Sequence, residues 1–124
     1  MNTLPMYIGG ELVTTESVYD VVNPATLEVT GSITKANASN ANQALEAAEK
    51  AFATWSTTTI SERVHWMNKL RDAVIENETA LREAIQLEMG KNWAGTQEDF
   101  ESLVNSLAFY AEEISRFRPD SLLD

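Results

Sequence analysis

The segment NANQALEAAEKAFATW, residues 40–55, decides the fold, because the spacing of apolar residues changes here from two to about 3.6. Its apolar side chains fall on one face of a helix, and Glu46, Glu49 and Lys50 turn mostly away from that face. Asn40 is the predicted N-cap, with Gln43 three residues later as its reciprocal partner. We therefore expect an amphipathic helix that begins at Asn40.

Three further apolar stripes follow this helix. Thr59 and Glu62 have the spacing of a capping box and predict a second helix, which Asn77 interrupts. A third helix should start near Asn77 and end at Gly90, the residue type best suited to the left-handed conformation past a helix end. Thr96 then predicts the start of a fourth helix, with Pro119 as its stop.

The residues before this helical region alternate and contain turn formers. Tyr7–Val13 predicts two short strands around Gly9-Gly10, and a second pair is expected at Val18–Val22 and Val29–Ile33. The predicted fold is mainly α with an N-terminal β-hairpin region: β-hairpins over residues 1–36 and four helices over residues 40–116. No internal repeat or linker marks a domain boundary within residues 1–124.

Charge and composition exclude several classes of function. The formal net charge is −10 over 124 residues, which repels the phosphates of nucleic acids. We find no signal-peptide pattern and no apolar run long enough to cross a membrane. We therefore expect a cytoplasmic protein with no nucleic-acid or membrane partner.

No catalytic or cofactor-binding motif is apparent in the residues. The chain has no cysteine, and His65 is the only histidine, with no second ligand at metal-binding spacing. Carboxylate pairs such as Glu112 and Glu113 lie on helices that are otherwise rich in solvated charge. Gly9-Gly10 and Gly90-Lys91 do not complete a phosphate-binding loop.

Six short motifs follow one another along the chain: Tyr7–Val13, Val22-Asn23-Pro24-Ala25-Thr26, the Ala47–Trp55 helix, Ser61-Glu62-Arg63, Leu87–Lys91 and Phe109-Tyr110-Ala111. This ordered set resembles the opening of the NAD(P)-dependent aldehyde dehydrogenase family. Two residues depart from the family pattern. Leu27 replaces a common glycine, which predicts a turn with negative φ, and Asn92 replaces a common proline.

The resemblance implies the outer helical layer of an aldehyde dehydrogenase cofactor domain. The family oxidises an aldehyde to a carboxylic acid with NAD or NADP, using a cysteine nucleophile, a glutamate base and a nucleotide-binding loop. None of these matches a residue here. We therefore expect a truncated family member that is inactive by itself and binds no cofactor alone.

The resemblance also implies two sites. Glu88 matches a family ligand of a structural monovalent cation, completed by backbone carbonyls near Val21 and Val22; the alternative is an ordinary surface glutamate. Phe100 and Leu103 resemble the helix face at the mouth of the substrate tunnel; the alternative is core packing.

Two other functions remain open. One is a stand-alone helical interaction module that binds itself or a full-length relative. The other is an enzyme with an unrecognised carboxylate site. The apolar stripes carry more surface than four helices can bury against one another. We therefore expect self-association around Phe52, Trp55, Leu103 and Leu107.

Overall fold

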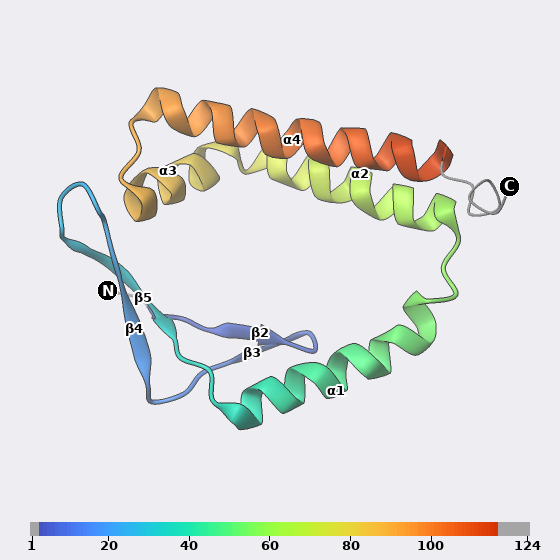
Figure 1. Ribbon diagram of the computed structural model, residues 1–124, viewed down its shortest axis with the longest axis horizontal. Helices are drawn as coiled ribbons and strands as arrows, with labels where there is room; N and C mark the ends of the chain where they lie inside the picture. The colour runs from blue at the N-terminus through green and yellow to red at the C-terminus, as the bar shows by residue number, and fades with distance from the viewer. Residues whose placement is uncertain (1–2, 117–124) are drawn as a thin grey trace, which may run out of the picture. The chain divides into compact units, whose positions relative to one another are not determined.

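The computed structural model describes residues 3–116 and divides by its contacts into two compact units. The first comprises the residues up to Thr57 together with Leu87–Gly90, and the second comprises Thr58–Gln86 and the chain from Lys91 onward. Within residues 3–116 the fold is mainly helical with short N-terminal strands, as predicted (Figure 1). None of the helices in this part of the chain is long and apolar enough to cross a bilayer.

The strands of the first unit form two small sheets. Strands β2 (Met6–Ile8) and β3 (Glu11–Val13) pair antiparallel around Gly9 and Gly10, whose φ angles are 62° and 96°. Both predicted hairpins are confirmed, because β4 (Val18–Val22) also pairs antiparallel with β5 (Val29–Thr34). The parallel pairing of β1 (Thr3–Leu4) with β5 was not predicted.

Helix α1 spans Ala38–Trp55, and the predicted N-cap at Asn40 is wrong by three residues. Asn37 is the N-cap: its side chain accepts from the Asn40 backbone N–H at 3.0 Å, and the Asn40 side chain accepts from the Asn37 N–H at 3.0 Å. Asn40 is thus the reciprocal partner in the capping box. The error arose because Asn37 and Asn40 have the same side chain, and only Asn37 has the extended backbone of a cap.

The turn between β4 and β5 corrects the prediction for Leu27. Its φ is +60°, not negative. The Leu27 N–H donates to the Asn23 carbonyl at 2.8 Å, and closing a loop of this length commonly requires a left-handed last residue. The Leu27 side chain is 78% exposed, so it meets no packing obstacle in this conformation.

The second unit is built on two long helices. Helices α2 (Ile60–Glu76) and α4 (Trp93–Arg116) lie side by side (Figure 1). Among residues 3–116 the buried hydrophobic side chains are Phe100 and Ala111, both on α4. The first unit therefore buries no hydrophobic side chain among its described residues.

Helix boundaries in this part of the chain mostly agree with the sequence. Helix α3 spans Glu78–Met89 and is followed by Gly90 with φ +64°, as predicted. Helix α4 begins three residues before Thr96, because the Asn92 side chain accepts from the Gly95 N–H at 2.7 Å and supplies the first cap. The predicted stop at Pro119 lies outside the described residues.

The capping box of α2 makes stability depend on pH. The Glu62 carboxylate accepts hydrogen bonds from the Thr59 backbone N–H and from the Thr59 hydroxyl. Both bonds, the backbone one more strongly, lower the pKa of Glu62 below its ordinary value of 4.5, and the smaller effect of burial acts in the opposite direction. Because the folded pKa is depressed, the stabilisation is present above the unfolded pKa and is lost as pH falls through the folded pKa. We expect Glu62→Gln to lower the unfolding midpoint at neutral pH, and the gap to the parent chain to close below pH 4.5. Thermal unfolding of both chains across acidic pH measures this, and a gap independent of pH would contradict it.

Candidate functional site

The predicted cation site lies within the first unit. Gly90 approaches the turn after β4 so closely that an added Cβ would lie 2.9 Å from the Ala25 Cβ and 3.0 Å from the Asn23 side-chain oxygen. Glu88 stands two residues before Gly90, and Val22 one residue before Asn23, so the segments that carry the predicted ligands adjoin one another.

The backbone here is partly committed to other contacts. The Val21 carbonyl accepts the Thr30 hydroxyl at 3.1 Å, and the ladder between β4 and β5 shifts register between Val21 and Val22. Glu88 is exposed. Residues 3–116 contain no group of three histidine, aspartate or glutamate side chains that could hold a metal. A cation at this place would depend on backbone carbonyls, and Glu88, Val21 and Val22 remain predicted ligands.

The two residues predicted at a tunnel mouth lie in different surroundings. Phe100 is 7% exposed and packs in the core of the second unit. Leu103, three residues further along α4, is 44% exposed. The burial of Phe100 agrees with the packing alternative, whereas Leu103 presents its side chain to the surface; the tunnel-mouth role of both residues stays a prediction.

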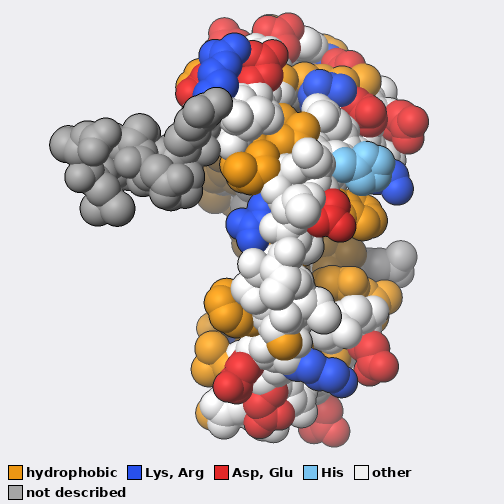
Figure 2. Space-filling view, turned by 90° about the vertical axis from the view of Figure 1, so that its right-hand side faces the viewer, with side chains coloured by type: hydrophobic (Ala, Val, Ile, Leu, Met, Phe, Trp, Pro, Cys, Tyr) orange, Lys and Arg blue, Asp and Glu red, His pale blue; other side chains and the backbone are white. Residues whose placement is uncertain are grey.

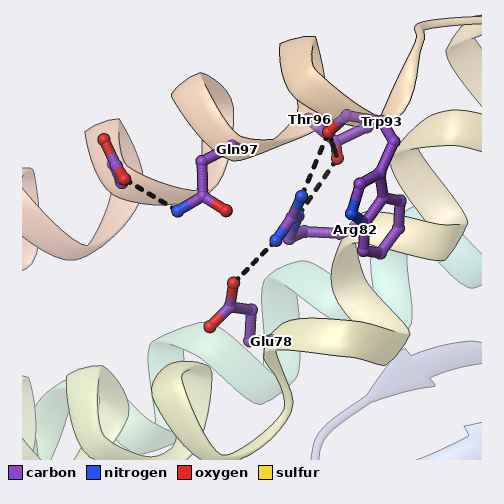
Figure 3. Close-up of polar contacts among 6 residues, drawn as sticks. Glu78, Arg82, Trp93, Thr96 and Gln97 are labelled. Carbon is purple, nitrogen blue, oxygen red and sulfur yellow. Dashed lines mark hydrogen bonds and ion pairs between the residues drawn. The ribbon is translucent and has the colours of Figure 1, made fainter.

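The best organised polar cluster was missed by the sequence analysis and centres on Arg82 of α3 (Figure 3). Its guanidinium donates to Glu78 at 2.8 Å, to the Thr96 hydroxyl at 3.1 Å and to the Trp93 carbonyl at 3.1 Å. It also stacks over the Trp93 ring, with its carbon 3.9 Å from the ring centre. These contacts join α3 to the first turn of α4.

The cluster is complete in itself. Thr96 is fully buried, and its hydroxyl both accepts from Arg82 and donates to the Trp93 carbonyl at 2.8 Å. All three guanidinium nitrogens of Arg82 donate within the cluster, so the arrangement is suited to holding two helices together. The i,i+4 spacing of Glu78 and Arg82 was the available signal, but nothing local pointed to Thr96.

Gly9 and Gly90 do not form a cradle for a nucleotide phosphate. A Cβ at Gly9 would lie 3.2 Å from the Ala47 Cβ, and the space beside Gly90 is filled by the turn after β4. Phosphate loops need backbone N–H groups that face open space. Every buried side-chain nitrogen and oxygen among residues 3–116 also has a hydrogen-bond partner. Neither Gly9 nor Gly90 therefore offers a place for the phosphates of NAD or NADP, and the absence of a bound cofactor stays a prediction.

Comparison with known proteins gives a consistent relationship. The family model described as "Aldehyde dehydrogenase family" matches residues 12–123. The glutarate-semialdehyde dehydrogenase of Pseudomonas aeruginosa is 33% identical over 102 residues, which cover 82% of this chain and 21% of the relative. The 1-pyrroline-5-carboxylate dehydrogenase of Geobacillus thermodenitrificans is 30% identical over 115 residues, covering 92% and 22%.

Solved structures agree with these relatives. A structure of 1-pyrroline-5-carboxylate dehydrogenase from Thermus with bound NAD superposes with a TM-score of 0.89 at 33% identity, covering 94% of this chain and 23% of that one. Lactaldehyde dehydrogenase from Escherichia coli superposes with a TM-score of 0.87 at 31% identity, covering 94% and 25%. The chain spans about a quarter or less of these relatives. The match over nearly all its residues places the chain in the aldehyde dehydrogenase family.

Proposed function

We propose that this chain supplies the N-terminal section of a cytoplasmic enzyme that oxidises an aldehyde to a carboxylic acid with NAD or NADP. The proposal is supported mainly by the match of the family model to residues 12–123. The superposition on the NAD-bound Thermus enzyme supports it as well. Its role there is structural. The Arg82 cluster joins α3 to α4, and Gly90 joins the end of α3 to the turn after β4.

The chemistry of the reaction then resides outside these residues. The chain has no cysteine thiol to attack a carbonyl, and Gly9-Gly10 and Gly90-Lys91 do not complete a phosphate-binding loop. We expect the purified chain to give no aldehyde oxidation with NAD or NADP above a protein-free blank. Spectrophotometric assay of NADH or NADPH measures this. Turnover that persists after repurification would contradict it and would favour an unrecognised carboxylate site.

A graft tests the structural role directly. This chain replaces the matching segment of the Thermus 1-pyrroline-5-carboxylate dehydrogenase, and the control is the same enzyme with that segment deleted. We expect the graft to restore soluble enzyme and measurable NAD-dependent turnover, because the two segments superpose closely. A folded graft that binds NAD but has no turnover would count against the proposal.

Exposed apolar side chains favour a second candidate function, association with a second copy or with a full-length relative. Phe52 is 67% exposed, Trp55 47% and Leu103 44%, while Leu107 is half-buried. Hydrophobic side chains also reach the surface in the space-filling view (Figure 2). Covering apolar surface contributes about 25 cal/mol per Å², so even a few hundred Å² would favour association by several kcal/mol before its entropic cost.

A further inference from the structure

Helix α1 buries very little of its surface. Asn40 is its one buried residue and Ala47 is half-buried, while every other residue of the helix is exposed. The exposed residues include large apolar side chains: Leu45 is 69% exposed and Phe52 67%. The helix therefore forms without the burial of an apolar face, which is the main source of stability for most helices in proteins.

The polar contacts of α1 add little to hold it in place. Reciprocal capping bonds between Asn37 and Asn40 fix its first turn. Of the ion pairs formed within residues 3–116, none includes Glu46, Glu49 or Lys50, the charged residues of this helix. The first turn carries no acidic residue and the last turn no basic one, so the helix dipole is not compensated at either end.

The tertiary contact of α1 is small. Strand β2 is the element that α1 contacts most. The approach is close where Gly9 faces Ala47, because a Cβ built on Gly9 would lie 3.2 Å from the Ala47 Cβ. An open hollow of about 390 Å³ remains beside this contact, lined by residues 7–10 and by four alanines of α1. A glycine and an alanine bury little apolar area, so the contact gives little hydrophobic stabilisation.

We infer that α1 unfolds and refolds locally while α2, α3 and α4 stay folded. The other three helices are held by the buried side chains of Phe100 and Ala111 and by the hydrogen bonds of Arg82. Isolated helices of up to about 15 residues are marginal in water even when rich in alanine, and α1 has only 18 residues. Segments with few buried apolar contacts are those that open at the lowest free energy. The chain therefore exchanges between a form with α1 closed on β2 and a form with α1 open.

Amide hydrogen exchange of the full chain, followed by NMR at low protein concentration, tests this inference. We expect the backbone amides of Leu45 and Lys50, in the middle of α1, to be protected less than about a hundredfold. The amides of Val104 and Leu107, in the middle of α4, should be protected about a hundredfold more than those of α1, because they exchange only when the long helices separate.

Two exposed alanines within helices provide matched variants. Ala48 lies on α1 and Ala84 on α3. Glycine lowers the stability of a helix by a similar amount at either position. Ala48→Gly should lower the protection of α1 further and leave that of α4 unchanged, because α4 stays folded when α1 opens. Ala84→Gly should lower the protection of α4 about fivefold, since Arg82 joins α3 to α4.

Two exposed lysines allow an independent test by proteolysis. Lys50 lies within α1 and Lys69 within α2. A protease cuts a helix only when the segment around the bond opens, so the rate of cleavage reports the population of the open form. We expect trypsin to cut after Lys50 at least about tenfold faster than after Lys69.

Three results would overturn the local opening of α1: equal protection of α1 and α4, equal loss of protection at both helices in Ala48→Gly, or equal rates of cleavage after the two lysines. Protection of α1 that is low in the dilute chain and rises with protein concentration would support the opening and would also favour the association proposed above. None of these results bears on the turnover of the grafted enzyme, which tests the catalytic proposal separately.

Discussion

Replacing Arg82 with methionine is expected to lower the free energy of unfolding by about 2–4 kcal/mol. Arg82 is 8% exposed, and the change removes three hydrogen bonds and the stacking on Trp93. It also leaves the buried Thr96 hydroxyl without its donor. Methionine keeps the length and the helix propensity of arginine, so the loss reports the polar contacts.

Arg71→Met is the matched control. Arg71 pairs with the adjacent Asp72 at 2.8 Å, and the Asp72 side chain is 60% exposed. Exposed pairs contribute about 0–1 kcal/mol, so we expect a much smaller loss. Arg82→Lys should recover only part of the stability, because lysine cannot donate to three partners in one plane. Chemical denaturation of the parent chain and the three variants measures these differences in the free energy of unfolding. Equal losses for Arg82→Met and Arg71→Met would show that the Arg82 cluster stabilises the fold no more than an exposed ion pair does.

Gly90→Ala is expected to cost about 2–4 kcal/mol, the second large effect. Two costs add at this position. The φ of +64° is disfavoured for a residue with a Cβ, and that Cβ would lie 3.0 Å from the Ala25 backbone nitrogen and 2.9 Å from its Cβ. Backbone atoms cannot move aside as a flexible side chain would, so the end of α3 must shift away from the turn.

Gly31→Ala provides the contrast. A Cβ at Gly31 meets no atom within 4 Å, and its φ is not in the left-handed region. Alanine there should leave stability unchanged or raise it by up to about 1 kcal/mol, because it restricts the unfolded chain. Both variants are compared by thermal unfolding. A loss at Gly31 as large as that at Gly90 would mean that the close approach after α3 is not the cause.

Local patterns explain why much of the fold was predictable. The capping box of α2 involves the four residues from Thr59 to Glu62, and the turn at Gly9-Gly10 likewise joins Ile8 to Glu11 within four residues. The end of α3 is marked by Gly90, which directly follows the helix. Such signals are satisfied by neighbours in the chain, so they hold in any surroundings. The N-cap of α1 was misplaced because two asparagines three residues apart offer the same chemistry, and only the backbone distinguishes them.

The candidate site was less predictable. The resemblance named Glu88, with Val21 and Val22, for a cation and Phe100 and Leu103 for a tunnel mouth, and those roles remain predictions. It did not suggest Arg82, because its partner Thr96 is fourteen residues away and looked like a simple helix cap. Phe100 was named for a tunnel but is buried in the core, since a stripe of apolar residues does not reveal which of them a neighbouring helix will cover.

The sequence by itself determined the family, the order of hairpins and helices, and the absence of a thiol nucleophile, because these depend on residue identity and short-range periodicity. The tertiary structure alone decided that Arg82 holds α4, that Gly90 lies against the turn at Ala25, and that Leu27 takes a positive φ. Each of the first two depends on contacts between residues far apart in the chain, and the third on a loop closed by its own backbone hydrogen bond. Such geometry arises only when the chain has folded.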